Sequence, residues 1–320
     1  MEQLWRRAIK KNLQISIVIP TYHRMHDLNT CLDSILTQTT LPEEIIIVDD
    51  SDNNEIEQLI QRRLIEFKNI KIVLKYLRNE RDKSLTISRN LGVKNAIGDI
   101  ILFLDSDVIL ENKYIEEILK MHKKKPDAIG VQGYITNSCK FTRSNKLLRR
   151  LFFQSNLEKE KCRILTSVMS TYPYELNHII SCEWLSGANC SFRKEIFNNF
   201  MFDEKIRRYD DIDFSYRIFK KYPGSLLITP DAKLIHIVSK AGRLPKKEST
   251  YLNEVNRLYY FYNNINQTFI NNIIFFWSSI GFIIFNYKNI NPKQFICAYL
   301  YALKHLNEIK KGDLDFLKKL

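Results

Sequence analysis

Long apolar stretches are scarce in this sequence. The longest near the C-terminus, 273–285, covers 13 residues, and spanning a bilayer takes about 20. Near the N-terminus the apolar run ISIVI stops at Pro20, which is too short for a signal peptide. The sequence therefore predicts neither a crossing helix nor a secretory leader, and we interpret 269–287 as a re-entrant or in-plane membrane contact or as a buried hairpin.

Glycine, proline and paired cysteines are also few. The 9 Gly and 8 Pro argue against long disordered linkers, and no internal repeat or low-complexity tract is present. The 6 cysteines contain no CxxC pair, which disfavours a zinc knuckle or a redox motif. A reduced, cytosolic compartment is the natural expectation for such scattered cysteines.

Positive charge is abundant. The net charge of +13 and the pI near 9.3 predict attraction to nucleic acid, acidic lipid or a phosphorylated substrate. No nucleic-acid recognition motif accompanies the charge, so we expect no nucleic-acid partner. Segment 140–163 carries eight Lys or Arg against two Glu, interleaved with Leu and Phe. It predicts a basic amphipathic helix for an anionic membrane surface, or else a helix that covers the functional site with its lysines in water.

Strand and helix patterns alternate through the first hundred residues. Short β-branched runs at 15–20, 43–50, 70–77 and 99–107 alternate with helical spacing at 27–39, 54–67 and 86–98. This alternation indicates an α/β fold, in which a parallel sheet has helices on both faces.

Three polar clusters fall at the carboxyl ends of these predicted strands, where such sheets bind ligands. They are Pro20-Thr21-Tyr22, Asp49-Asp50 and Asp105-Ser106-Asp107. A divalent cation held between Asp105 and Asp107 would explain two carboxylates after a buried strand, and a solvated turn is the alternative. A phosphoacceptor domain is disfavoured because a whole strand–helix unit precedes the first acids. A nucleotidylyltransferase is disfavoured because PTYHR lacks glycine.

Five ordered segments together resemble the family 2 glycosyltransferases, which are inverting enzymes of GT-A fold. The resemblance covers roughly residues 14–240. It implies a mostly parallel Rossmann-like sheet flanked by helices, with a helical C-terminal appendage. The catalytic domain would span 1–240, with a nucleotide-binding half at about 14–110 and an acceptor half at about 111–240. Residues 241–320 would form the membrane-associating appendage. The segments are SIVIPTYHR with CLDSILTQT, EEIIIVDDS, SRNLGVKNAIGDIILFLDSD, WLSGANCSFRKEIF and YDDIDFSYRI.

The resemblance also implies roles for individual residues in binding the donor. Asp105 and Asp107 would hold Mg2+ or Mn2+, with Asp107 the better candidate for direct coordination. His236 would be a third metal or diphosphate ligand, or else an ordinary core histidine. The remaining donor-binding candidates are Pro20, Tyr22, Arg24, Asp50, Arg89, Ser106, Gly187 and Ala188, with Asp105 also contacting the donor.

An acidic pair would supply the general base. The family places this pair at the start of a helix; here it is Asp210-Asp211, and Asp211 matches the base position. Helix capping is the alternative role for these acids. Trp184 would line the acceptor side, or else pack in the core.

These observations predict a cytosolic enzyme that is peripheral on the inner face of the membrane. It would transfer a sugar from a nucleoside-diphosphate sugar, preferably a UDP-sugar, to a hydroxyl of a glycan or lipid-linked glycan. The alternative is a non-catalytic, anion-binding scaffold at the membrane that keeps the fold. Retention of both acidic pairs argues against the scaffold.

Overall fold

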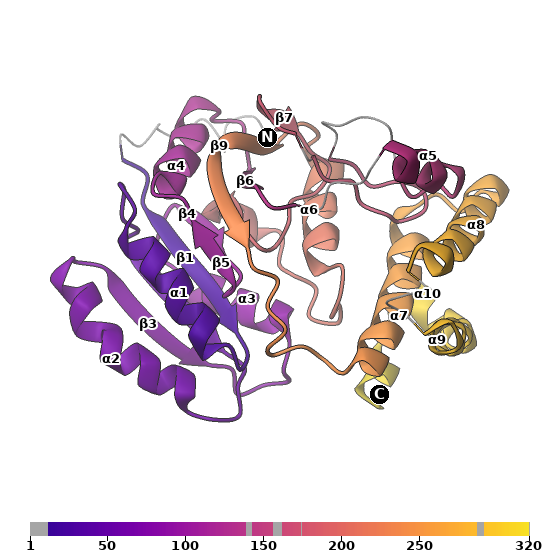
Figure 1. Ribbon diagram of the computed structural model, residues 1–320, viewed down its shortest axis with the longest axis horizontal. Helices are drawn as coiled ribbons and strands as arrows, with labels where there is room; N and C mark the ends of the chain where they lie inside the picture. Colours follow the sequence, from indigo (N-terminus) through magenta and orange to yellow (C-terminus); the bar gives the residue numbers. More distant parts are fainter. Residues whose placement is uncertain (1–11, 139–142, 156–161, 174, 287–290, 320) are drawn as a thin grey trace. The chain divides into compact units, whose positions relative to one another are not determined.

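The computed structural model describes residues 12–138, 143–155, 162–173, 175–286 and 291–319. Contacts divide the chain into two compact units (Figure 1). The first contains residues 1–138, 176–204 and 214–242, and the second contains 139–175, 205–213 and 243–320.

The first unit is built on a mixed sheet in the order β3-β2-β1-β4-β8-β6-β9-β5, with β7 paired to β9. The strand pairings give six of its described strands, β3, β2, β1, β4, β6 and β9, one common direction. The predicted α/β fold with a mostly parallel sheet is therefore confirmed. The strands are β1 (Ile15–Thr21), β2 (Glu44–Asp49), β3 (Val73–Arg78), β4 (Ile100–Phe103), β5 (Val108–Leu110), β6 (Gly130–Ile135), β7 (Ile180–Ser181), β8 (Cys190–Arg193) and β9 (Leu226–His236).

Helices cover both faces of this sheet. One face packs against α1 (Met25–Leu36), α2 (Glu55–Asn69) and α4 (Tyr114–Lys124), whose apolar residues share a core cluster with alternate residues of β1. The other face packs against α3 (Leu85–Asn95), where a Cβ on Gly92 would collide with Val18. On that face Phe214 of α6 (Asp210–Lys221) also stacks on Phe202. Continuous burial of both faces explains why β1, β2 and β4 read as unbroken Ile/Val-rich runs.

A buried polar cluster around Glu44 joins the first strands of the parallel sheet. The carboxylate of Glu44 accepts hydrogen bonds from the Ser16 hydroxyl and the Ile97 amide, both at 2.6 Å, and pairs with the Lys75 ammonium at 2.5 Å. Burial alone would raise the pKa of Glu44, but these partners outweigh it and the net pKa lies below the ordinary value. Such a carboxylate holds β1, β2, β3 and the end of α3 together while ionised.

The described part of the second unit is mainly helical, with non-helical segments such as 162–173, where Ile164 and Ser170 form an isolated β-bridge. It contains α5 (Arg143–Leu151), α7 (Lys246–Asn264), α8 (Phe269–Asn286), α9 (Pro292–Lys304), α10 (Leu306–Lys311) and the 3-10 helix η2 (Asp315–Lys319). The predicted helical C-terminal region is thus confirmed. None of the described helices is both long and apolar enough to cross a membrane.

The helix predicted over 140–163 is much shorter than expected. It ends at Leu151, and 152–155 and 162–163 are not helical, while 140–142 and 156–161 lie outside the described residues. Tertiary contacts end it: the Trp277 indole N–H donates to the Leu151 carbonyl at 2.7 Å, and the Gln154 amide donates to the Ser278 carbonyl at 2.6 Å. Phe153 adopts a left-handed φ of 51°, which a continuing helix does not allow.

Candidate active site

The two carboxylates of the DxD segment lie in the turn between β4 and β5. Strand β4 ends at Phe103 and β5 begins at Val108, so Asp105 and Asp107 lie in the connection between the two strands and not within either strand. The Asp105 amide donates to the Ala188 carbonyl at 3.1 Å, while Ser106 is buried. This arrangement lets both carboxylates converge beyond the end of a buried strand.

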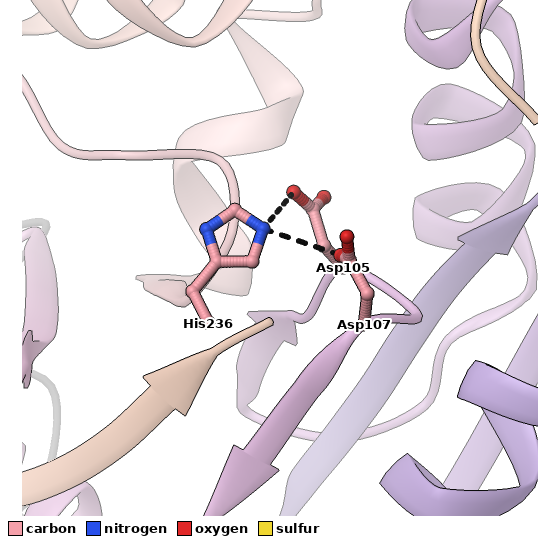
Figure 2. A group of neighbouring side chains, drawn as sticks. All are labelled: Asp105, Asp107 and His236. Atoms are coloured by element: carbon pink, nitrogen blue, oxygen red, sulfur yellow. Dashed lines mark hydrogen bonds and ion pairs between the residues drawn. The ribbon is translucent and has the colours of Figure 1, made fainter. Parts of the chain in front are cut away.

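His236 lies beside these carboxylates, although it follows Asp107 by 129 residues in the sequence. It is the last residue of β9, which pairs antiparallel with β5 so that His236 lies opposite Val108. Its Nε2 is 3.2 Å from Asp107 Oδ1 and 3.9 Å from Asp105 Oδ2 (Figure 2). One ligand atom from each of the three residues fits within 4.8 Å. The structure thus places His236 with the DxD pair and not in an apolar core.

This donor set fits a divalent cation of the Mg2+ or Mn2+ kind. Two carboxylates supply hard oxygen ligands, and one imidazole nitrogen is a ligand that Mn2+ also accepts. The imidazole already sits at hydrogen-bond distance from Asp107, so the three side chains are gathered by the protein's own contacts. The residues present therefore match the predicted ion.

The segment after β9 wraps around Asp107. The Ile237 amide donates to the Asp107 carbonyl at 2.9 Å, and the Ser239 amide donates to its carboxylate at 2.8 Å. Between them Val238 adopts a φ of 57°, which is an outlier for a β-branched residue. Strain of this kind persists only where surrounding contacts hold it, and it is concentrated at functional positions.

The same segment closes on the loop after β1. The Arg24 guanidinium donates from Nε to the Ala241 carbonyl at 2.9 Å, and its Nη1 is 3.3 Å from Asp107 Oδ2. Gly242 has a φ of 62°, and a Cβ there would collide with the Tyr22 carbonyl oxygen. Only glycine meets both conditions. Residues 237–242, here called the closing loop, therefore contact both the Tyr22 backbone and Arg24, and Arg24 lies beside Asp107. The donor-binding roles of Tyr22 and Arg24 stay predictions.

The three clustered side chains have shifted pKa values. Burial raises the pKa of Asp105 above its ordinary value, although the charges of Arg89 and His236 oppose this. Burial also acts on Asp107, but the hydrogen bond from His236 and the charge of Arg24 outweigh it and lower the pKa. Burial disfavours the charged form of His236, yet the two carboxylates raise its pKa overall. His236 and Arg24 thus stabilise the ionised form of Asp107, which is the less exposed of the two DxD carboxylates.

Arg89 lies beside the other DxD carboxylate, that of Asp105. Its Nη2 is 3.5 Å from Asp105 Oδ1, its guanidinium lies 5.4 Å over the Phe202 ring, and the residue is only 2% exposed. A Cβ on Gly187 would collide with this guanidinium. The predicted donor residues Arg89, Gly187 and Asp105 are therefore in mutual contact, and the lack of a side chain at 187 leaves room for the arginine.

The two acids at the end of β2, Asp49 and Asp50, differ in burial and in hydrogen-bond partners. Asp49 is fully buried and accepts from the Tyr76 hydroxyl at 3.0 Å. The carboxylate of Asp50 is half-buried and accepts from Asn79 at 2.6 Å and from Ser88 at 2.8 Å, both on one oxygen. Burial raises the pKa of Asp50 despite these hydrogen bonds. These partners fix the orientation of Asp50, and its contact with a nucleotide stays a prediction.

The aromatic candidate Tyr22 lies at the end of β1, next to the buried Pro20. The Lys83 ammonium is 5.1 Å from the centre of its ring and 3.2 Å from Asp52, which also pairs with His23 at 2.9 Å. The sequence did not reveal the contact between Lys83 and Tyr22, because it forms only when the loop after β3 lies near the end of β1. Sequence reasoning missed the closing loop as well, although Gly242, one of 9 glycines, was an available signal.

The acidic pair proposed as the base begins α6. Asp210 is buried, Asp211 is half-buried, and the Asp211 carboxylate accepts from the Ile212 amide at 2.8 Å. A capping side chain accepts from an amide two or three residues further along, so this bond to the next residue is not itself a cap. The capping role and the base role of the pair both stay predictions. The residue before the pair, Tyr209, has a strained φ of 62°, and burial raises its pKa to about 12. Trp184 is 8% exposed, and its acceptor role stays a prediction.

Comparison with known proteins identifies the family. The sequence model described as "Glycosyl transferase family 2" matches residues 16–180, more than half of the chain. The chain belongs to glycosyl transferase family 2. Among relatives of this family 2 protein, glycosyltransferase GlyA of Streptococcus pneumoniae serotype 4 is 31% identical over 38% of this chain and 17% of its own length. Chondroitin synthase of Pasteurella multocida is 25% identical over 67% of this chain and 24% of its own. The chain thus spans a quarter or less of the length of these two relatives.

Solved structures agree on the fold. The crystal structure of GalNAc-T7 with UDP, GalNAc and Mn2+ superposes with a TM-score of 0.57 at 16% identity, covering 84% of this chain and 55% of that one. The likeness shows that the family 2 protein has the GT-A fold predicted from its sequence.

Proposed function

We propose that this family 2 protein is an inverting glycosyltransferase. It transfers a sugar from a nucleoside-diphosphate sugar to a hydroxyl of a glycan or lipid-linked glycan. A UDP-sugar is the favoured donor, because the neighbour GalNAc-T7 was solved with UDP and because Asp50 offers a carboxylate acceptor suited to a uracil N–H. Family membership supports glycosyl transfer itself.

The chain's own residues would bind and orient the donor. Tyr22 offers a ring to the base, and Asp50 is held by Asn79 and Ser88 to accept a hydrogen bond from it. Arg24 lies beside Asp107 and Arg89 beside Asp105, and both would contact diphosphate oxygens, where fixed positive charge stabilises a departing anion. Asp105, Asp107 and His236 would hold Mg2+ or Mn2+. The bound ion would supply positive charge to the leaving nucleoside diphosphate.

Asp211 would take the proton from the acceptor hydroxyl. It lies in the first turn of α6, and the resemblance of YDDIDFSYRI to the family's acidic pair supports its role. A carboxylate acting as general base contributes roughly two to four orders of magnitude in rate. Asp210, more buried than Asp211, would then organise the acceptor side without taking the proton.

One observation carries this proposal: residues from four separate segments, namely Arg24, Arg89, the DxD pair and His236, meet at one sheet edge. The test is Asp107→Ala, assayed by calorimetric titration of UDP with and without Mn2+. We expect the variant to keep its fold and lose the metal-dependent part of UDP binding, while the exposed-site control Asp127→Ala binds as the wild type does. Unchanged metal dependence in Asp107→Ala would show the metal role to be wrong. Failure of the wild type to bind any nucleoside diphosphate would favour the non-catalytic scaffold.

A further inference from the structure

Helix α8 exposes large apolar side chains along one face. Over its 18 residues, Phe269 to Asn286, it has no charged residue. Phe269, Ile273, Phe276, Ile280 and Ile284 are between 45% and 82% exposed, and their spacing of three or four places them on a single side of the helix. Monomeric proteins in water rarely leave a contiguous apolar area of this kind uncovered, so a partner is expected there.

Helices α5 and α9 are neighbours of α8 (Figure 1). Trp277 of α8 stacks on Phe152, just after α5, with ring centres 5.2 Å apart. Phe276 of α8 packs edge to face with Tyr299 of α9, with ring centres 6.3 Å apart. Beside these contacts α5 exposes Leu147 and Leu151, and α9 exposes Ile296 and Leu300. We call the exposed apolar residues of α5, α8 and α9 together the apolar surface.

The three helices that carry the apolar surface contain no acidic residue. Their sequences have no Asp or Glu, and the basic residues whose side chains the structure describes there are Arg149 and Arg150 of α5 and Lys293 and Lys304 of α9. A second copy of this chain would bring an identical basic set against the first, which like-charge repulsion disfavours. An anionic lipid surface complements both properties, because it accepts apolar side chains and attracts Lys and Arg.

We propose that the apolar surface binds the face of an anionic lipid bilayer, with α8 lying in the plane of the membrane. The exposed side chains of α8 enter the headgroup–acyl boundary, and the basic residues of α5 and α9 meet lipid phosphates. Trp277, 44% exposed, adds the apolar surface of its ring at this depth, while its N–H is held by the Leu151 carbonyl. In-plane binding agrees with the finding that none of the described helices could cross a membrane. The inference is independent of sugar transfer, and it would bring the protein to the surface where lipid-linked acceptors lie.

The test is flotation of the full-length protein with vesicles of phosphatidylcholine containing 0% or about 30% phosphatidylglycerol. The wild type is expected to bind the anionic vesicles, and high salt should weaken this binding without abolishing it, because salt screens charge but not apolar burial. The double variant Ile273→Asp/Ile280→Asp should lower the partition coefficient at least about tenfold, since it puts two carboxylates into the boundary region. Arg150→Gln/Lys293→Gln/Lys304→Gln should instead reduce only the salt-sensitive part.

The matched control is Ile65→Asp, the same replacement at a 73%-exposed isoleucine on α2 in the first unit, which should bind vesicles as the wild type does. Circular dichroism and a melting curve show whether the aspartate variant is folded. If it is not, the milder variant Ile273→Ser/Ile280→Ser takes its place in the vesicle assay. Equal binding by the wild type and a folded double variant would overturn the proposal. The proposal would also be overturned if the wild type failed to bind anionic vesicles. One form of that outcome is a wild type that light scattering shows to be a dimer, with its apolar surface covered by a second copy. UDP binding unaffected by the double variant would separate this result from the proposed transferase activity.

Discussion

Replacing Gly242 by alanine should damage donor binding far more than it damages the fold. Gly242 combines a φ of 62° with a close approach to the Tyr22 carbonyl oxygen, so an added Cβ meets backbone strain and a collision together. Gly224 offers a matched control, because its φ is 82° and nothing lies within 4 Å of the Cβ position. Both variants incur about 1–2 kcal/mol of left-handed strain, but only Gly242→Ala must displace its neighbours.

The displacement should open the closing loop. Relieving an overpacked contact costs about 1–3 kcal/mol, and moving residues 237–242 is the local way to relieve it. The loop would then lose the hydrogen bond from the Ser239 amide to the Asp107 carboxylate, worth about 1.5–3 kcal/mol because the acceptor is charged. Arg24 would lose its anchor on Ala241. A loss of that size in assembling the site corresponds to roughly a 10- to 100-fold weaker donor complex.

Calorimetric titration of UDP with Mn2+ measures the donor site, and differential scanning fluorimetry measures stability. We expect Gly242→Ala to melt a few degrees below Gly224→Ala, because only Gly242→Ala adds the collision to the shared strain. Only Gly242→Ala should also show the weaker binding. Equal UDP affinity for Gly242→Ala and Gly224→Ala would refute the reasoning, because it would mean that the closing loop does not organise the site.

Two further predictions concern the general base and the buried polar cluster around Glu44. Asp211→Asn should lower the turnover number by roughly two to four orders of magnitude with little change in donor affinity, and Asp210→Asn should cost less; wild-type rates in both would support helix capping. Glu44→Gln should lower the free energy of unfolding by about 1–3 kcal/mol at pH 7, measured by urea denaturation. Because the folded pKa of Glu44 lies below its ordinary 4.5, its contribution is present above that value and is lost as the pH falls through the folded pKa. A difference between wild type and variant that stays constant down to about pH 3 would contradict this.

Local sequence signals were sufficient for the sheet and for part of the site. The apolar runs of β1, β2 and β4 and the helical spacing of α1 depend on neighbouring residues only, and each forms close to its predicted range. The ends of β1, β2 and β4 then bring Tyr22, Asp50 and Asp105 to one edge, because parallel strands share a carboxyl-terminal side.

The helix expected over 140–163 shows where local signals fail. The basic-apolar pattern continues past Leu151, but α5 stops there because Trp277 and Gln154 make hydrogen bonds between this segment and α8. Such contacts join residues more than 120 positions apart, so no periodicity within the segment could reveal them.

The sequence by itself determined the parallel α/β core, the position of the DxD carboxylates after a buried strand and the excess of positive charge. These follow from side-chain chemistry and from the period of apolar residues along one element. Only the tertiary structure decided that His236 and Ser239 contact Asp107, that Gly187 leaves space for Arg89, and that α8 exposes its apolar face. Those features depend on which strand lies beside which and on which helix face its neighbours cover, and both are set by packing between residues distant in sequence.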